Sequence, residues 1–156
     1  MCWKCDNPNA DPQVYLNELR EDIAQYGFAI QFVGDDRRPF AYTIGLHEIG
    51  LHELLVTGLS ADASSRVLYT VGCQMMAEGL RLVPSAHINL AGEFHLEVVE
   101  VEHPDVHLKF AVDLCGTSIR AYQLVWADAR GRWPWDPRWT HGRRLQAVLG
   151  ARKLLG

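Results

Sequence analysis

The sequence predicts a single α+β domain over residues 1–156, built on a mainly antiparallel sheet with two to three packed helices. Short apolar runs with the period of strands outnumber the apolar patterns with the period of helices. The segments that join the first three runs are too short for parallel crossovers, which need a dozen or more residues. The chain has neither an internal repeat nor a linker, so we expect one domain. Closure of the sheet into a barrel-like form is left open.

Two helices are expected from the signals at their ends. Asp11-Pro12 begins the first, because aspartate caps a helix and proline at the first helical position loses no hydrogen bond. Gly27 suits the end of that helix, and Ser60 caps the second, which runs to about Glu78. The second helix carries two apolar stripes, namely Val67, Leu68, Val71 and Met75, and then Tyr69, Cys73, Met76 and Leu80. A helix that is apolar on two faces is buried on both or pairs with another subunit, so one expected partner is a second copy.

Strands are expected between turn-forming residues, the first three as an antiparallel meander. They span residues 28–33, 40–46, 54–57, 87–90, 94–101 and 121–126. Within 94–101 the apolar residues change parity between Val98 and Val99, which predicts a bulge. His103-Pro104 is expected to open a short helix through Leu114.

Composition and charge exclude several classes of protein. There is no apolar run long enough to cross a membrane and no apolar signal core at the N-terminus, so we expect a cytoplasmic protein. Residues 1–129 carry eight Lys and Arg against eighteen Asp and Glu, whereas the Trp-rich segment 130–156 carries seven against one. An acidic body repels polyanions, so nucleic-acid binding is not expected.

Cys2 and Cys5, in the N-terminal segment 1–10, form the sharpest chemical signal. Thiolates at this spacing can both bind one tetrahedral zinc ion, and cytoplasmic thiols are normally reduced. A complete site needs ligands from the folded body, and His52 is our candidate among the histidines and the other cysteines. The leading interpretation is therefore a zinc-binding protein. A redox pair is disfavoured because Asp6, Asn7 and Pro8 follow the motif and a nearby carboxylate raises the pKa of a thiol, and two reduced thiols packed against the body remain the alternative.

A second candidate site is a ligand pocket at the rim of the sheet. Tyr42 lies in the second expected strand, Glu53 lies directly before the third, and Trp133 and Trp135 lie in a proline-stiffened cover. Such a pocket suits a small molecule or a flavin-type cofactor, and would make the protein an enzyme. Since the sequence has no phosphate loop, dinucleotide fingerprint or Ser-His-Asp arrangement, enzyme activity stays open. The tryptophans alternatively seal the core.

Two further interpretations rest on surface patterns. Glu93, His95 and Glu97 share one face of a strand, which is either a cation site or the solvated side of an antiparallel sheet. The basic tail and the two-faced helix are typical of an interaction module that binds a protein partner.

Four separated segments, in order, point to one known family. They are FAYTIGL at 40–46, HELLVTGL at 52–59, YQLVWAD at 122–128 and GRWPWDP at 131–137. With the MCWKCD opening, they resemble the bacterial domain-of-unknown-function family 4262. The resemblance implies a compact bacterial cytoplasmic domain in which the tryptophan segment belongs to the fold, and it carries no catalytic residue across. The chain departs from the family's His-Pro-Glu pattern, because Leu54 follows His52-Glu53 without the proline.

Overall fold

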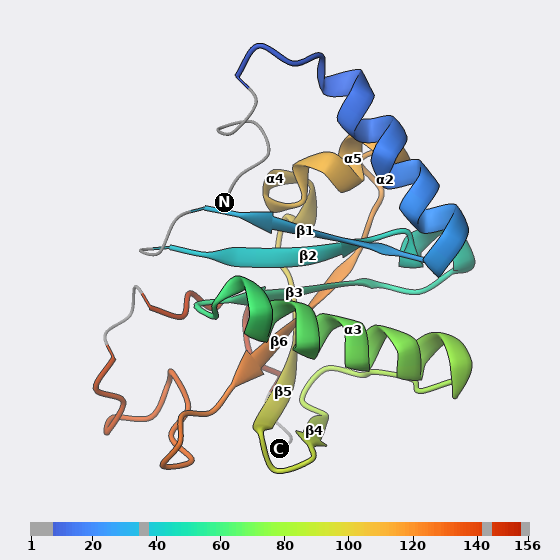
Figure 1. Ribbon diagram of the computed structural model, residues 1–156. Coiled ribbons are helices and arrows are strands. Elements are labelled where there is room, and N and C mark those ends of the chain that lie inside the picture. The colour runs from blue at the N-terminus through green and yellow to red at the C-terminus, as the bar shows by residue number, and fades with distance from the viewer. Residues whose placement is uncertain (1–7, 35–37, 142–144, 154–156) are drawn as a thin grey trace.

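The computed structural model describes residues 8–34, 38–141 and 145–153 as one sheet with helices on both faces (Figure 1). The strands are β1 (Ala29–Val33), β2 (Phe40–Ile44), β3 (Glu53–Thr57), β4 (His87–Leu90), β5 (Phe94–Glu100) and β6 (Ala121–Trp126). Their order across the sheet is β1-β2-β3-β6-β5-β4. The α+β class predicted from the sequence is confirmed.

The sheet is mixed and open. Every neighbouring pair is antiparallel except β3 and β6, which run parallel with Glu53 opposite Ala121. The parallel pair arises because the chain leaves β3, passes through a long helix and the β4–β5 hairpin, and returns beside β3. Within the described ranges β1 and β4 each pair with one strand, so the barrel-like alternative is wrong.

Separate hydrophobic clusters hold helices against the two faces of the sheet. The helices are α2 (Pro12–Tyr26), α3 (Ala61–Ala77), α4 (Pro104–His107), α5 (Lys109–Cys115) and the 3₁₀ helix η1 (Leu46–Ile49). One cluster joins α3 to β-strand residues such as Leu54 and Leu124, and the other joins α2 and α5 to residues such as Leu55. No helix in these ranges is long and apolar enough to cross a membrane.

The predicted helix ends form as expected. The Asp11 carboxylate accepts the backbone N–H of Gln13, and Gly27, with φ 94°, closes α2 by donating to the Ile23 carbonyl. The Ser60 hydroxyl caps α3 by accepting the backbone N–H of Ala63. These bonds satisfy groups that a helix leaves unpaired at its ends, which is why short-range sequence signals locate both helices.

Two local expectations were wrong. The single helix expected from His103 to Leu114 is broken at Leu108, whose backbone leaves the helical region (φ −96°, ψ 64°) while its side chain is fully buried. The bulge expected near Val98 is absent from the pairing of β5 with β6, which is continuous from Leu96 to Glu100. Both parities of β5 are apolar because both faces are covered, with Leu96 and Val98 packed on the α3 side.

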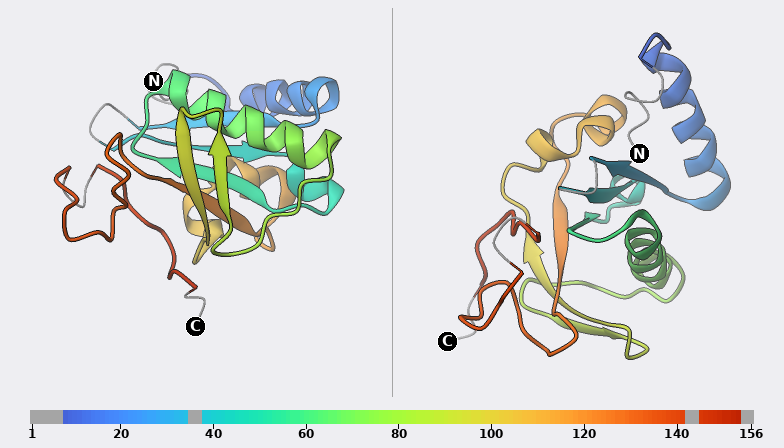
Figure 2. Two further views of the ribbon diagram at one scale, coloured as in Figure 1. Left: turned by 90° about the horizontal axis from the view of Figure 1, so that it is seen from below. Right: turned by 60° about the vertical axis from the view of Figure 1, so that its left-hand side comes forward.

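The C-terminal strap, defined here as residues 145–152, lies across β5 and β6 (Figure 2). The Gln146 side chain accepts the N–H of Trp126 and donates to its carbonyl, each at 2.9 Å. The backbone N–H of Leu149 donates to Gln123 Oε1 at 2.8 Å. The basic tail is therefore part of the folded body as far as residue 152.

The two stripes of α3 have different surroundings. Val67, Leu68 and Val71 are fully buried, as a core stripe should be. In the second stripe Tyr69 is 57% exposed and Met76 is 37% exposed, whereas Cys73 and Leu80 are partly buried against the hydrophobic cluster. The expectation that this stripe pairs with a second copy stays a prediction.

Candidate functional site

The residues expected to bind zinc are only partly described. Cys2 and Cys5 lie outside the described residues. Within residues 8–34, 38–141 and 145–153 there is no group of three or more His, Cys, Asp and Glu side chains that could hold a metal ion. Of the three predicted zinc ligands, His52 is the one that lies among the described residues.

His52 stacks on the ring of Tyr122, with ring centroids 4.0 Å apart and planes 8° apart. Its Nε2 atom is shielded from solvent and has no hydrogen-bond partner among the described residues, while Glu100 Oε1 lies 3.9 Å away. Desolvation by burial, followed by the charge of Arg120, lowers the pKa of His52. The imidazole is thus neutral at pH 7, which is the form that binds metals.

Glu53 is fully buried at the start of β3 and holds the loop before it. Its carboxylate accepts the Thr43 hydroxyl at 2.8 Å and the backbone N–H groups of Gly45, Leu46 and His47 at 2.9 to 3.2 Å. These three N–H groups belong to the N-terminal end of η1. Burial raises the pKa of Glu53 to about 7, and the hydrogen bonds oppose that rise. The contacts give Glu53 a structural role.

Tyr42 lies opposite Leu55, two residues from Glu53, whereas the tryptophans lie beside a different part of the sheet. The buried Tyr42 hydroxyl accepts the backbone N–H of Phe110 at 3.0 Å and so anchors α5. Trp133 and Trp135 stack on each other with centroids 5.5 Å apart, and Trp133 also contacts the ring of His95.

The pairing register of β6 places Glu53 and the two tryptophans at opposite ends of that strand. Glu53 lies opposite Ala121 at one end of β6, whereas His95 precedes Leu96, which lies opposite Trp126 at the other end. The structure therefore does not bring the four predicted pocket residues together.

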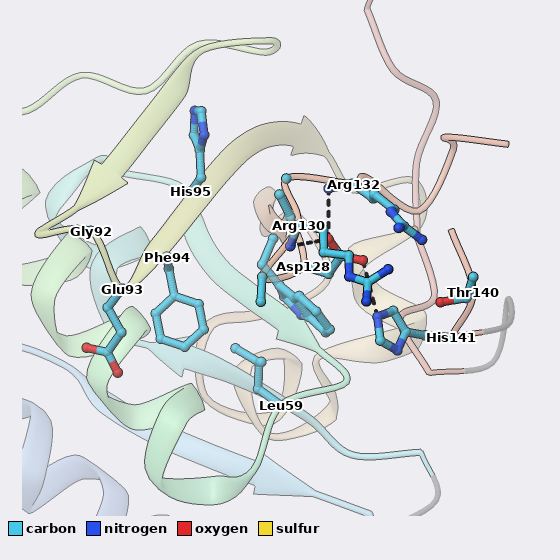
Figure 3. Close-up of a pocket in the computed structure, with 14 residues that line it drawn as sticks. Leu59, Gly92, Glu93, Phe94, His95, Asp128, Arg130, Arg132, Thr140 and His141 are labelled. Atoms are coloured by element: carbon cyan, nitrogen blue, oxygen red, sulfur yellow. Dashed lines mark hydrogen bonds and ion pairs between the residues drawn. The ribbon is translucent and has the colours of Figure 1, made fainter. Parts of the chain in front are cut away.

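A cavity of about 770 Å³ opens beside the end of β6 that carries Trp126. We call it the rim cavity. One side comes from the β4–β5 turn with Phe94 and His95, and the other from the loop after β6 with Asp128 and Arg130 (Figure 3). Its lining residues are Leu59, Gly92, Glu93, Phe94, His95, Trp126, Ala127, Asp128, Ala129, Arg130, Gly131, Arg132, Thr140 and His141.

Asp128 organises the loop on the basic side of the rim cavity. Its carboxylate accepts the backbone N–H groups of Arg130 at 2.9 Å and Arg132 at 2.8 Å, and His141 Nε2 lies 3.2 Å from its second oxygen. Burial raises the pKa of Asp128, but these hydrogen bonds outweigh it and hold the pKa below its usual value. Gly131 completes the turn with φ 74°. Asp128 is therefore an ionised structural anchor whose charge is already compensated.

The other charged side chains of the described lining differ in their partners. Glu93 pairs with Arg66, which lies outside the lining. The Arg132 guanidinium donates to the Arg138 carbonyl at 2.8 Å. The Arg130 guanidinium has no hydrogen bond or ion pair within the part of the chain that the structure describes.

The apolar part of the lining consists of Leu59, Phe94 and Trp126. Trp126 is held in place, because its Nε1–H donates to the Thr57 carbonyl at 2.8 Å. The Trp139 ring lies 5.5 Å from the Trp126 ring, centroid to centroid. The rim cavity thus combines a rigid apolar surface with a guanidinium that has no partner among the residues described.

Sequence reasoning did not select Asp128 or His141 for a site, although it noted the arginines around the tryptophans. A signal was present in Asp128-Ala129-Arg130-Gly131, because aspartate two residues before an N–H donor and glycine at a positive φ are typical of a tight turn. His141 had no such signal, since it reaches Asp128 only through the folded loop.

The part of the chain that forms the sheet matches a known family. The family model described as Domain of unknown function (DUF4262) matches residues 22–140. The match contains all six strands and all but the last lining residue of the rim cavity, and it leaves Cys2, Cys5 and the C-terminal strap outside. No curated protein and no solved structure matches the chain.

Proposed function

This chain belongs to the DUF4262 family, whose name assigns no activity, and we propose that its rim cavity binds a small organic anion. The proposal rests on one observation: Arg130, whose guanidinium has no hydrogen bond or ion pair among the described residues, lines the same cavity as Phe94 and Trp126. A guanidinium presents a rigid fork of donors that matches carboxylate or phosphate oxygens. The volume of about 770 Å³ lies in the range of small-molecule sites.

The expected ligand is an anion with a flat apolar part. Its anionic group would accept hydrogen bonds from Arg130, and its apolar part would lie against Trp126 and Phe94. An inorganic anion would use only the first of these contacts and would bind more weakly. The neighbouring carboxylates do not repel the ligand strongly, because Asp128 and Glu93 are already paired.

The experiment measures binding of benzoate, adenosine monophosphate and inorganic phosphate by calorimetry, with tryptophan fluorescence as a second readout. We expect an aromatic anion to bind, and Arg130→Gln to weaken it about tenfold, the effect of losing one charged hydrogen bond. Arg120→Gln is the matched control, because Arg120 is an exposed arginine at the opposite end of β6. Absence of binding by all three probes, or equal binding by both variants, contradicts the proposal. An absorbance spectrum of the purified protein tests the flavin alternative.

As a second candidate we propose zinc binding by Cys2 and Cys5 with His52. The supporting observation is the neutral His52 ring, whose Nε2 lacks a hydrogen-bond partner among the described residues. Because that atom is shielded from solvent, the ring has to turn before it can bind a metal. Zinc per chain is measured by elemental analysis of protein purified without chelators. Equal zinc in wild type and in Cys2→Ser/Cys5→Ser overturns the proposal, and full retention in His52→Gln removes His52 from it.

A further inference from the structure

A second cavity, of about 520 Å³, lies between the start of β2, the end of β3, α4 and the C-terminal strap. We call it the strap cavity. Among the described residues it shares no lining residue with the rim cavity, and its described lining has no acidic side chain; it consists of Arg38, Pro39, Phe40, Thr57, His107, Leu145, Ala147 and Leu149. Its independence from Arg130 allows the two cavities to be tested separately.

The walls of the strap cavity are apolar. Phe40 and Leu149 are half-buried and pack against the hydrophobic cluster that contains Tyr42 and Leu55. The polar groups in these walls are already paired, since the Thr57 hydroxyl donates to the Ala147 carbonyl at 2.8 Å. The Thr57 hydroxyl oxygen also accepts from Gln123 Nε2 at 3.3 Å. A ligand therefore meets hydrocarbon on these sides.

Two basic side chains supply the polar part of the lining. Arg38 is exposed, and its guanidinium has no hydrogen bond or ion pair with any residue that the structure describes. The His107 ring is half-buried and likewise makes no hydrogen bond there. Burial, then the charges of His103 and Lys109, lower the pKa of His107, so the ring is neutral at pH 7. Within the described lining, Arg38 thus contributes the only fixed charge.

We propose that the strap cavity binds a medium-chain aliphatic carboxylate. The carboxylate would meet Arg38, with His107 as a neutral hydrogen-bonding group, and the hydrocarbon chain would lie along Phe40 and Leu149. A single fixed cation matches a monoanion, and the apolar walls match an unbranched chain without further polar groups. The volume suits a small molecule, since such sites commonly measure about 300–1,000 Å³.

The experiment titrates the full chain with hexanoate, octanoate and decanoate below their micellar concentrations, and with decanol, by calorimetry at pH 7. Affinity is expected to rise with chain length, and decanol to bind more weakly than decanoate. Arg38→Gln is expected to weaken decanoate about tenfold. The matched control is Arg81→Gln, because Arg81 is an exposed arginine outside the lining. Equal loss in both variants, or no dependence on chain length, overturns the proposal.

A second variant tests decanoate binding in the strap cavity without changing a charge and without altering the rim cavity. Ala147→Phe places a ring in the strap cavity but leaves intact the Ala147 carbonyl that Thr57 and Gln123 bind. Decanoate binding should be lost in Ala147→Phe and unchanged in Arg130→Gln. Thermal unfolding of each variant confirms that it is folded. Decanoate binding that survives Ala147→Phe, or that disappears in Arg130→Gln, contradicts the assignment to this cavity.

Discussion

Arg152 donates two hydrogen bonds to Glu97, with Nε 2.7 Å from Oε2 and Nη2 2.9 Å from Oε1. The same guanidinium lies 3.8 Å from the centroid of the Trp135 ring. Glu97 is 3% exposed and also accepts from the His87 ring at 2.9 Å. One side chain of the strap therefore ties β5 to the tryptophan segment, which explains why the last basic residues belong to the folded body.

We predict that Arg152→Ala lowers the free energy of unfolding by about 2 kcal/mol, because the buried Glu97 carboxylate then keeps only the His87 ring as a hydrogen-bond partner among the described residues. The expected loss is moderate because the Arg152 side chain is 33% exposed and water screens its charge. Urea unfolding followed by tryptophan fluorescence measures the effect. Lys153→Ala is the control, because Lys153 is the exposed neighbouring cation. A loss no larger than that of the control would show that the Arg152–Glu97 pair adds no stability.

The pH dependence of this pair has a defined sign. Burial raises the pKa of Glu97, but the hydrogen bonds from Arg152 and His87 outweigh it and the pKa lies below 4.5. A lowered folded-state pKa contributes stability above the unfolded value that is lost as the pH falls through the folded value. We expect wild type to lose stability below pH 4.5 more steeply than Glu97→Gln. Parallel acid-unfolding curves for the two proteins would contradict this.

Glu53 should produce the opposite dependence at higher pH. Burial raises its folded-state pKa from 4.5 to about 7. Protonation of Glu53 therefore stabilises the folded state. This stabilisation is complete below pH 4.5 and is lost as the pH rises through 7, which lowers the free energy of unfolding by about 3 kcal/mol. Urea unfolding at several pH values between 4.5 and 8 measures the slope. Glu53→Gln does not titrate and should remove the slope, even if its overall stability is lower; an unchanged slope assigns the effect to other groups.

Gly58 allows the strap to approach β3. Its φ is 81°, and a Cβ atom placed on it would lie 2.2 Å from the Leu145 carbonyl oxygen. Gly92 has a similar φ of 75° but no atom within 4 Å of such a Cβ. Gly92→Ala should lower the free energy of unfolding by about 1 kcal/mol through backbone strain alone. Gly58→Ala should lower it clearly more, because the strap has to move away from the new Cβ atom. Thermal unfolding of both variants measures the two losses, and equal losses would show that the strap shifts freely.

The Cys115 thiol should be alkylated slowly in the native protein. Burial, followed by the charges of Glu53 and Glu48, raises its pKa to about 11. The thiolate is the reactive form, so alkylation at pH 8 should be about a hundredfold slower than for a thiol at its reference pKa of 9. Peptide mass spectrometry after timed iodoacetamide treatment measures the rate at Cys115. Labelling in urea is the control, and an equal rate in native protein contradicts the raised pKa.

Local signals predicted the secondary structure well because they act over a few residues. The cap at Asp11, the stop at Gly27 and the cap at Ser60 each form the expected bonds. The same reasoning failed at Val98, where both faces of β5 are covered and a parity change needs no bulge. It also failed at Leu108, where burial of one side chain breaks a helix.

Local sequence patterns predicted the candidate site far less well than they predicted the secondary structure. Glu53 looked like a pocket carboxylate from its place before β3, but in the fold it holds the N–H groups of η1. Arg130 lies in the basic, Trp-rich segment of the sequence, and only the fold places it in the lining of one cavity with Trp126. Cys2 and Cys5 remain a sequence-based prediction.

The sequence by itself determined the α+β class, the two capped helices and most strands, because hydrophobic period and capping bonds arise between residues close along the chain. Only the tertiary structure decided that β6 lies parallel to β3, that the sheet stays open, and that the strap covers β5 and β6. Those features join residues as distant as Glu53 and Ala121, or Glu97 and Arg152. Such distant residues pair because the compact fold has to bury the apolar faces and to give buried charges a partner. A sequence pattern over a few residues does not determine which distant residues meet these needs.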